Sequence, residues 1–170
     1  AGKTISFIRH VLGTSNPVVR VMPNTPTLVG AGMAAASMGT GVTAAQRDFV
    51  LGFLGATGKV IEVSEDLQDA VTATSGSGPA YFFAFVEAMV DGAKELGLSH
   101  EDATTLTVQT IVGAAKLLDQ SGKSATTLRE NVTSPNGTTA AALASFASDE
   151  MNSMVAKAMK AARDRSQELA

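Results

Sequence analysis

The stretch Lys59-Val60-Ile61-Glu62-Val63-Ser64-Glu65-Asp66 marks the point at which the character of the chain changes. Its first five residues are rich in β-branched side chains, which is typical of a strand. Beyond Ser64 the strand signals disappear, and alanine, glycine, methionine and leucine take over. The sequence therefore predicts an α/β part before this stretch and an all-helical part after it.

Helix and strand patterns alternate upstream of this stretch. The spacing of apolar residues predicts a helix over residues 4–12 and strands over residues 18–22 and 33–37. Thr43, with a glutamine three residues later, is typical of a capping box, so we expect a helix to begin there and to end in residues 55–58. A strand, a helix and a parallel strand in this order form an α/β unit.

Downstream, the pattern predicts a succession of helices. Pro79 suits the first turn of a long helix in which apolar side chains wrap most of the circumference. A helix that is apolar all round is buried on several sides, and a small helical domain cannot do this alone, so we expect a second chain. The predicted helices cover residues 66–74, 79–96, 101–118, 126–132, 139–146 and 149–169.

Composition excludes several classes of function. The 170 residues suffice for one domain or two small ones, and 45% hydrophobic residues exclude wholesale disorder. A net charge of −3, with no tryptophan and one tyrosine, argues against a nucleic-acid partner. The longest wholly apolar run, residues 80–86, is too short to span a membrane.

The same composition limits the possible chemistry and location. With no cysteine, the chain has no thiol nucleophile and no thiolate metal site, and it fits a reducing, cytoplasmic location. His10 and His100 lack partners at metal-ligand spacing, so we predict no metal site. No signal peptide is visible at Ala1, and the chain opens without methionine.

Two glycine-rich stretches are candidate anion sites. Residues 39–44 match G-x-G-x-x-A, with Glu62 at about the spacing that a dinucleotide fingerprint requires. However, the expected cap at Thr43 places the helix start after the glycines, so we expect an ordinary connection there. In Ser75-Gly76-Ser77-Gly78-Pro79 we expect Ser77 to cap the long helix and the glycines to admit a neighbouring backbone.

The stretch Ser134-Pro135-Asn136-Gly137-Thr138-Thr139 predicts a tight turn that leads into a helix. Ser134 and Thr139 can place hydroxyls on one side of the turn, and the N–H groups of Gly137, Thr138 and Thr139 can face a ligand over the helix start. Such groups hold a carboxylate through charge-assisted hydrogen bonds and the helix dipole. From spacing alone, an ordinary helix–helix connection is an equally good interpretation.

Three motifs resemble one family, pyrroline-5-carboxylate reductase, the last enzyme of proline synthesis. They are Val19-Arg20-Val21-Met22-Pro23-Asn24-Thr25-Pro26, then Asp69-Ala70-Val71-Thr72 with Ser75–Tyr81, and then Asn131-Val132-Thr133-Ser134-Pro135-Asn136-Gly137-Thr138-Thr139. The family usually has two glycines after the proline of the third motif, and here the first of them is Asn136. Asparagine tolerates a left-handed backbone, so we expect the turn to survive.

The resemblance implies a fold and a division of the chain. The family begins with a Rossmann fold whose first turn carries G-x-G-x-x-G, and no such turn is found in this chain. Residues 1–65 then correspond to an α/β remnant, the C-terminal part of the dinucleotide-binding Rossmann domain. Residues 66–170 correspond to an all-α domain for substrate binding and dimerisation.

The resemblance also implies roles for single residues. Ala1 and Asn131 match positions near the nicotinamide. Ser134 and the backbone at Gly137, Thr138 and Thr139 match the site for the substrate carboxylate. The hydroxyl of Thr139, the implied catalytic residue, holds the ring nitrogen, and Glu65 matches a position near the substrate that the partner subunit can supply.

The implied reaction is hydride transfer from NADPH or NADH to 1-pyrroline-5-carboxylate, which gives L-proline in a homodimer or higher homo-oligomer. Two alternatives stay open from the sequence. The chain alone could be a catalytically inactive helical dimerisation module, or it could belong to a related imine or hydroxy-acid dehydrogenase. Tight cofactor binding by this chain alone would contradict the first. Substrate screening against cyclic imino acids would test the second, which a preference for an open-chain acid would favour.

Overall fold

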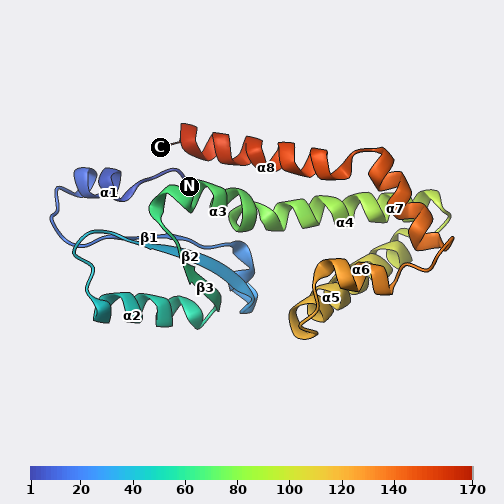
Figure 1. The fold of residues 1–170 in the computed structure, drawn as a ribbon, viewed down its shortest axis with the longest axis horizontal. Coiled ribbons are helices and arrows are strands. Elements are labelled where there is room, and N and C mark those ends of the chain that lie inside the picture. The colour runs from blue at the N-terminus through green and yellow to red at the C-terminus, as the bar shows by residue number, and fades with distance from the viewer. Residues whose placement is uncertain (170) are drawn as a thin grey trace. The chain divides into compact units, whose positions relative to one another are not determined.

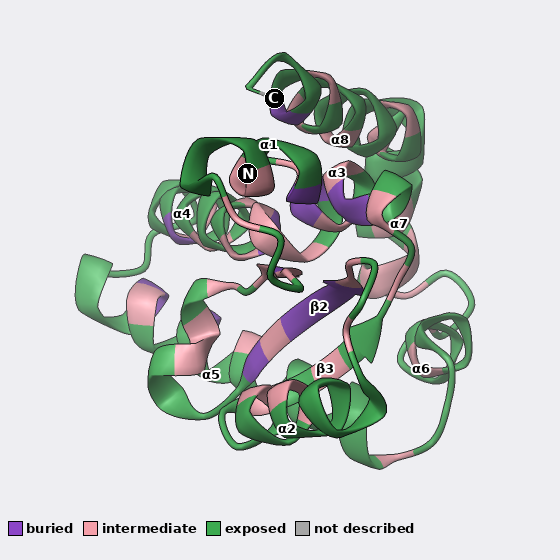
Figure 2. Cartoon of the chain, turned by 90° about the vertical axis from the view of Figure 1, so that its left-hand side faces the viewer, coloured by how far each residue is buried: buried purple, intermediate pink, exposed green. Residues whose placement is uncertain are grey.

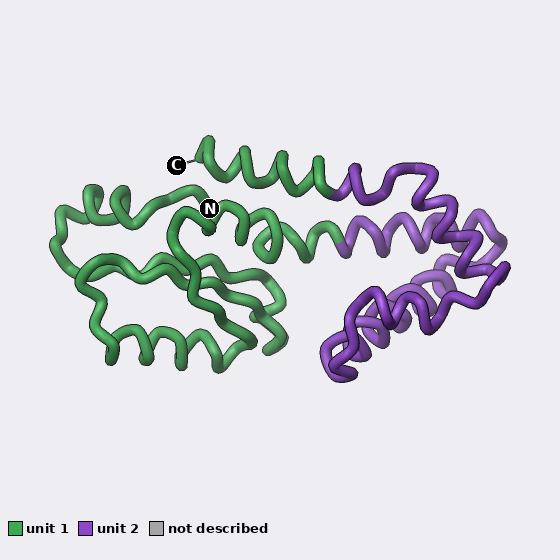
Figure 3. The backbone as a smooth tube through the Cα atoms, viewed as in Figure 1, with its two compact units in different colours: residues 1–81, 156–170 green, residues 82–155 purple. Residues whose placement is uncertain are grey.

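The structure is a computed structural model that describes residues 1–169. The chain forms two compact units, shown in different colours in Figure 3. The first contains Ala1–Tyr81 together with the C-terminal segment from Ala156, and the second contains Phe82–Val155. Figure 1 gives the labels of the helices and strands.

The first unit is built on a three-stranded sheet with the order β1-β2-β3. Its strands are β1 (Val19–Met22), β2 (Gly32–Met38) and β3 (Gly58–Glu62). β2 and β3 are parallel and are joined by α2 (Ala44–Gly55), which confirms the predicted α/β unit. β1 is antiparallel to β2, because a 3-10 helix over Thr25–Val29 reverses the chain where the sequence predicted a loop.

Helices cover both faces of this sheet (Figures 1 and 2). α2 lies on one face, and the predicted capping box is present at Thr43, whose side chain accepts a hydrogen bond from the N–H of Gln46. α1 (Ile5–Leu12) lies on the other side, capped by Thr4 and ended by Gly13 in the left-handed conformation. An ion pair of Arg47 with Glu62 joins α2 to the end of β3 and raises the pKa of Arg47.

Of the four residues between the predicted helices of residues 66–74 and 79–96, only Ser77 lies outside a helix. A 3-10 turn (Glu65–Leu67) leads into α3 (Gln68–Val71), a π-helix (Thr72–Gly76) and α4 (Gly78–Glu95). Ser77 has α-helical dihedrals, and its N–H donates to the carbonyl of Thr72. The expected cap at Ser77 is therefore wrong, because a π-turn carries the backbone across the glycines instead of breaking it.

The second unit is entirely helical. It contains most of α4, then α5 (His100–Gln120), α6 (Ala125–Asn131), α7 (Thr138–Ser148) and the first turn of α8 (Met151–Glu168). Ser99 caps α5, because its side chain accepts a hydrogen bond from the N–H of Asp102. Phe85 of α4 and Phe146 of α7 pack with their ring centroids 6.3 Å apart. With the sheet in the first unit, this confirms the predicted fold class of an α/β part followed by helices.

Few apolar side chains are buried in the single chain (Figure 2). Those of the described residues that are buried are Ile5, Ala34, Ala35, Ala36, Ala73, Val90 and Ala103. On α4, by contrast, Phe82 and Phe83 are 62% and 64% exposed. Among the described residues, no helix is both long and apolar enough to cross a membrane.

Candidate functional site

The connection between α6 and α7 forms a tight turn that precedes a helix. The N–H of Gly137 donates to the carbonyl of Ser134 at 3.0 Å, which closes a four-residue turn. Pro135 occupies its second position, and Asn136 at the third has a φ of 58°, in the left-handed region. Proline at the second position and a positive φ at the third are typical of a type II turn. The prediction that asparagine would preserve the turn is confirmed.

Three N–H groups are left without a partner at the start of α7. The first helical hydrogen bond runs from Ala141 to the carbonyl of Gly137. The N–H groups of Thr138, Thr139 and Ala140 therefore have no acceptor among the described residues. The prediction for Gly137 needs a correction, because its N–H is used within the turn, and Ala140 supplies the third free donor instead.

Hydroxyl groups adjoin these donors. The Ser134 hydroxyl lies over the α-carbon of Gly137, where any side chain would collide with it. Ser134 is exposed and Thr139 is half-buried, and neither hydroxyl bonds to another described residue. Asn131, the last residue of α6, is exposed. Hydroxyls, free N–H groups and the positive end of a helix dipole together can bind a small anion.

Glu65 and Ala1 belong to the other unit of the chain. One carboxylate oxygen of Glu65 accepts from the backbone N–H of Ile5 at 2.6 Å and lies 3.4 Å from the guanidinium of Arg20. The other guanidinium nitrogen of Arg20 lies 3.7 Å from Asp69. The structure thus places Glu65 in a partly buried ion-pair cluster around Arg20, and its contact with substrate stays a prediction.

Sequence reasoning missed this cluster, although a signal was present. Arg20 stands between two valines in a run that predicts a buried strand. A charge in such a position must find carboxylate partners, since burying it alone is costly. What the sequence could not supply was the identity of those partners, which come from a turn 45 residues away.

The N-terminal segment packs against the end of α8. Ala1 is exposed, whereas Gly2 is buried with a φ of 76°. A side chain at Gly2 would collide with the backbone of Ser166 and Leu169. The hydroxyl of Ser166 in turn donates to Asp69 at 2.7 Å.

The glycine-rich stretch 39–44 is a connection between β2 and α2, as predicted. The N–H of Gly39 donates to Val18, that of Val42 to Gly39, and that of Thr43 to the side chain of Gln46. These N–H groups are therefore hydrogen-bonded within the chain and are not available to bind a pyrophosphate. Ala1 and Asn131, the residues predicted to lie near a nicotinamide, are both exposed and so open to a ligand. Their contact with a cofactor stays a prediction.

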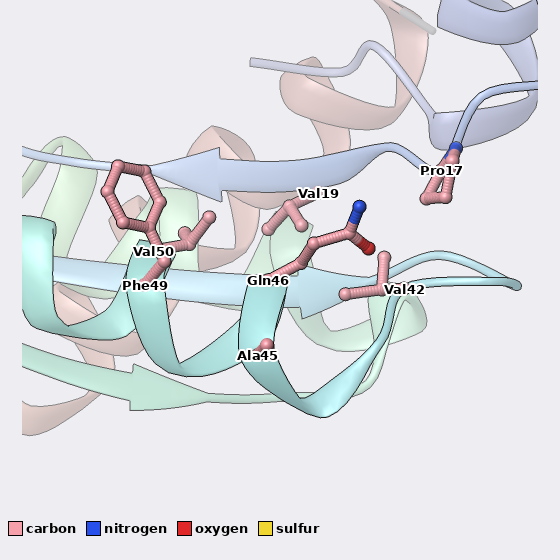
Figure 4. A pocket seen from close by; sticks show the side chains of 7 residues that line it. All are labelled: Pro17, Val19, Val42, Ala45, Gln46, Phe49 and Val50. Atoms are coloured by element: carbon pink, nitrogen blue, oxygen red, sulfur yellow. The ribbon is translucent and has the colours of Figure 1, made fainter.

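A pocket lies elsewhere in the first unit, between α2 and β1 (Figure 4). It measures about 490 Å³ and contains no ionisable side chain, so it offers no acid–base chemistry. The residues that line it are Pro17, Val19, Val42, Ala45, Gln46, Phe49 and Val50. Among the residues described, no three histidine or carboxylate side chains are grouped as a metal site would require.

Comparison with known proteins agrees with the three motifs. Residues 65–169 match the family described as "Pyrroline-5-carboxylate reductase dimerisation". The pyrroline-5-carboxylate reductase of Pseudomonas aeruginosa is 45% identical over 171 aligned residues, covering 100% of this chain. That of Mycobacterium leprae is 43% identical and covers 99%. The chain spans 63% of the length of both relatives.

Solved structures show the same likeness. The structure of a pyrroline-5-carboxylate reductase from Coxiella burnetii matches with a TM-score of 0.94 and 40% identity, covering 99% of this chain and 63% of that one. The Plasmodium falciparum pyrroline carboxylate reductase with NADP bound matches with a TM-score of 0.91 and 33% identity, covering 99% and 68%. From the motifs, the fold and these matches, the chain belongs to the pyrroline-5-carboxylate reductase family.

Proposed function

We propose that this chain is part of an oxidoreductase that reduces 1-pyrroline-5-carboxylate to L-proline with NADPH or NADH, in proline and hence amino-acid biosynthesis. The observation that carries the proposal is the turn before α7. There the Ser134 hydroxyl and the free N–H groups of Thr138, Thr139 and Ala140 adjoin the Thr139 hydroxyl. A cyclic imino acid presents a carboxylate and a ring nitrogen a short distance apart, which these two sets of groups complement.

In this mechanism the chain binds and orients the substrate. The Ser134 hydroxyl and the N–H groups at the start of α7 bind the carboxylate, at about 1.5–3 kcal/mol for each charge-assisted hydrogen bond. The Thr139 hydroxyl hydrogen-bonds to the ring nitrogen and fixes the plane of the C=N bond. A bound nicotinamide supplies the hydride. The proton comes from solvent, since a threonine hydroxyl is too weak an acid to give it up.

In the proposed enzyme the two parts of the chain have different roles. Residues 1–65 form the C-terminal part of a dinucleotide-binding Rossmann domain, in which Ala1 lies near the nicotinamide together with Asn131. Residues 66–170 form the substrate-binding and dimerisation domain, and Glu65 lies near the substrate. The protein works as a homodimer or higher homo-oligomer in the cytoplasm, with no nucleic-acid or membrane partner.

The test uses the full-length protein that carries this chain. We expect it to oxidise NADPH or NADH only when 1-pyrroline-5-carboxylate is present and to form proline in equal amount. Ser134→Ala and Thr139→Ala should each lower kcat/KM by about 10- to 100-fold, which corresponds to about 1–3 kcal/mol of lost binding in the transition state. Thr104→Ala on α5, which removes a threonine hydroxyl bonded only within its own helix, is the control. Unchanged kinetics in both site variants would overturn the assignment.

A further inference from the structure

Arg20 is the one charged residue that is buried among the residues the structure describes, at 9% exposure. A buried guanidinium is tolerated only when carboxylates neutralise it and accept its hydrogen bonds. Such a group constrains the elements that carry its partners, because separating it from them leaves an uncompensated charge. Its partners therefore show which parts of the first unit it holds together.

Two series of contacts connect Arg20 to the backbone of residues 1–5. Through one guanidinium nitrogen, Arg20 pairs with Glu65, whose oxygen also accepts from the N–H of Ile5 at the start of α1. Through the other nitrogen it pairs with Asp69, which accepts from the Ser166 hydroxyl on α8.

The second series of contacts, through Asp69 and Ser166, also reaches the N-terminal segment. Gly2 is packed so closely against the backbone of Ser166 that a side chain there could not fit. Residues 1–5 are thus held at two points. Ile5 is held by Glu65, and Gly2 packs against Ser166, which bonds to Asp69. Both carboxylates pair with Arg20.

The arrangement depends on the shape of the arginine side chain. Glu65 and Asp69 are four residues apart on the helical turns that follow β3, so both carboxylates lie on one face. The planar guanidinium presents separate nitrogens to the two of them. A lysine ammonium is a single point charge on a flexible stem and cannot hold both in a fixed geometry.

We propose that Arg20 is a positioning residue that sets the place of Ala1 and Gly2 against the nicotinamide end of the cofactor, and that α8 takes part in this through Ser166. The proposal rests on the proposed function, which assigns Ala1 to the cofactor. It adds that a helix at the C-terminal end of the chain controls cofactor affinity without touching the cofactor.

The experiment compares Arg20→Met, Arg20→Lys and Ser166→Ala with the wild-type full-length protein. Binding of NADPH is measured by its fluorescence without imino acid, together with the KM for each substrate and amide hydrogen exchange at Ile5. For Arg20→Met we expect a Kd for NADPH raised about tenfold, the worth of one lost hydrogen bond, together with faster exchange at Ile5. The KM for the imino acid should rise much less than the Kd for NADPH. Arg20→Lys can keep a pair with one of the two carboxylates, and Ser166→Ala keeps the contacts through Glu65, so both should give intermediate values.

Arg47→Met is the matched control, because it removes an arginine from an exposed ion pair with Glu62 in the same unit and should change none of these quantities. If Arg20→Met does not fold, the other two variants decide. The proposal is overturned if these variants bind NADPH as the wild type does, or if both KM values rise together with a lower melting temperature, as general destabilisation would cause. A wild-type protein that binds NADPH but forms no proline would refute the proposed function alone, since the comparison of Kd values would still stand.

Discussion

At the scale of single residues, Gly137 is required by its contact and not by its dihedral angles. Its φ of −83° is open to any residue, but a side chain would collide with the hydroxyl of Ser134 and crowd its carbonyl. Gly137→Ala should therefore rotate the Ser134 hydroxyl away from the start of α7. We expect kcat/KM for the imino acid to fall about 10- to 100-fold, the worth of one hydrogen bond to a charged group, while the free energy of unfolding falls by less than about 1.5 kcal/mol.

The control for this change is Gly52→Ala, in the middle of α2, where an added side chain meets open space. It should leave the kinetics unchanged and stabilise the protein by about 0.5–1 kcal/mol, because alanine is the better helix former. Steady-state kinetics and urea unfolding measure both variants. If Gly137→Ala had native kinetics, the hydroxyl of Ser134 would have no part in binding the carboxylate.

What the sequence could predict at this scale depended on local chemistry. The left-handed backbone at Asn136 follows from asparagine's own tolerance of that conformation, and the structure confirms it. The loss of the Gly137 N–H to the turn, and its replacement by Ala140, depend on which carbonyl closes the turn. The partners of Arg20 depend on pairing across distant parts of the chain, about which a residue pattern says nothing.

At the scale of elements, the junction between α7 and α8 contains an unfavourable residue. Glu150 has a φ of 53° just after the end of α7, a position where glycine is the usual residue. A left-handed conformation costs a residue with a β-carbon about 1–2 kcal/mol. Glu150→Gly should remove this strain, offset in part by the greater freedom of glycine in the unfolded chain, and stabilise the protein by about 0.5–1 kcal/mol in urea unfolding.

Replacing a glutamate by glycine within a helix tests whether the left-handed backbone at Glu150 causes the effect. Glu130 lies in α6, where the backbone is α-helical, so Glu130→Gly should destabilise the protein by about 0.5–1 kcal/mol. Opposite signs at the two positions would confirm that the backbone at Glu150 is the cause. Destabilisation at both would mean that the Glu150 side chain contributes more than its backbone costs.

Elements that are fixed by hydrogen bonds between neighbouring residues could be predicted from the sequence. The π-helix before α4, which contacts from other segments hold in place, could not. The capping box at Thr43 is confirmed because its two hydrogen bonds lie within four residues. The π-helix before α4 contradicts the break that serine, glycine and proline predict. Asn24 donates to the carbonyl of Ser75, and the hydroxyl of Tyr81 donates to that of Ala73, so contacts from outside the segment hold it.

At the scale of the whole molecule, the exposed apolar residues of the second unit point to a second copy of the chain. Phe82 and Phe83 on α4 and Leu106 on α5 are more than half exposed. Burying a large apolar side chain stabilises by about 1.5–3 kcal/mol, so leaving several exposed would forgo a large part of the stability of a small domain. The match of residues 65–169 to a dimerisation family supports the same conclusion.

We therefore expect light scattering with size exclusion to give at least twice the chain mass, for this chain or for the full-length protein, down to low micromolar concentration. Phe83→Asp would bury a charge in the interface, which costs far more than the lost apolar contact, so it should reduce the mass to that of one chain and lower the melting temperature. Leu28→Asp, the same kind of change at an exposed position of the first unit, should leave the mass unchanged. A monomer in the wild type, or an unaltered oligomer in Phe83→Asp, would show that this face of α4 is not the surface through which two copies associate.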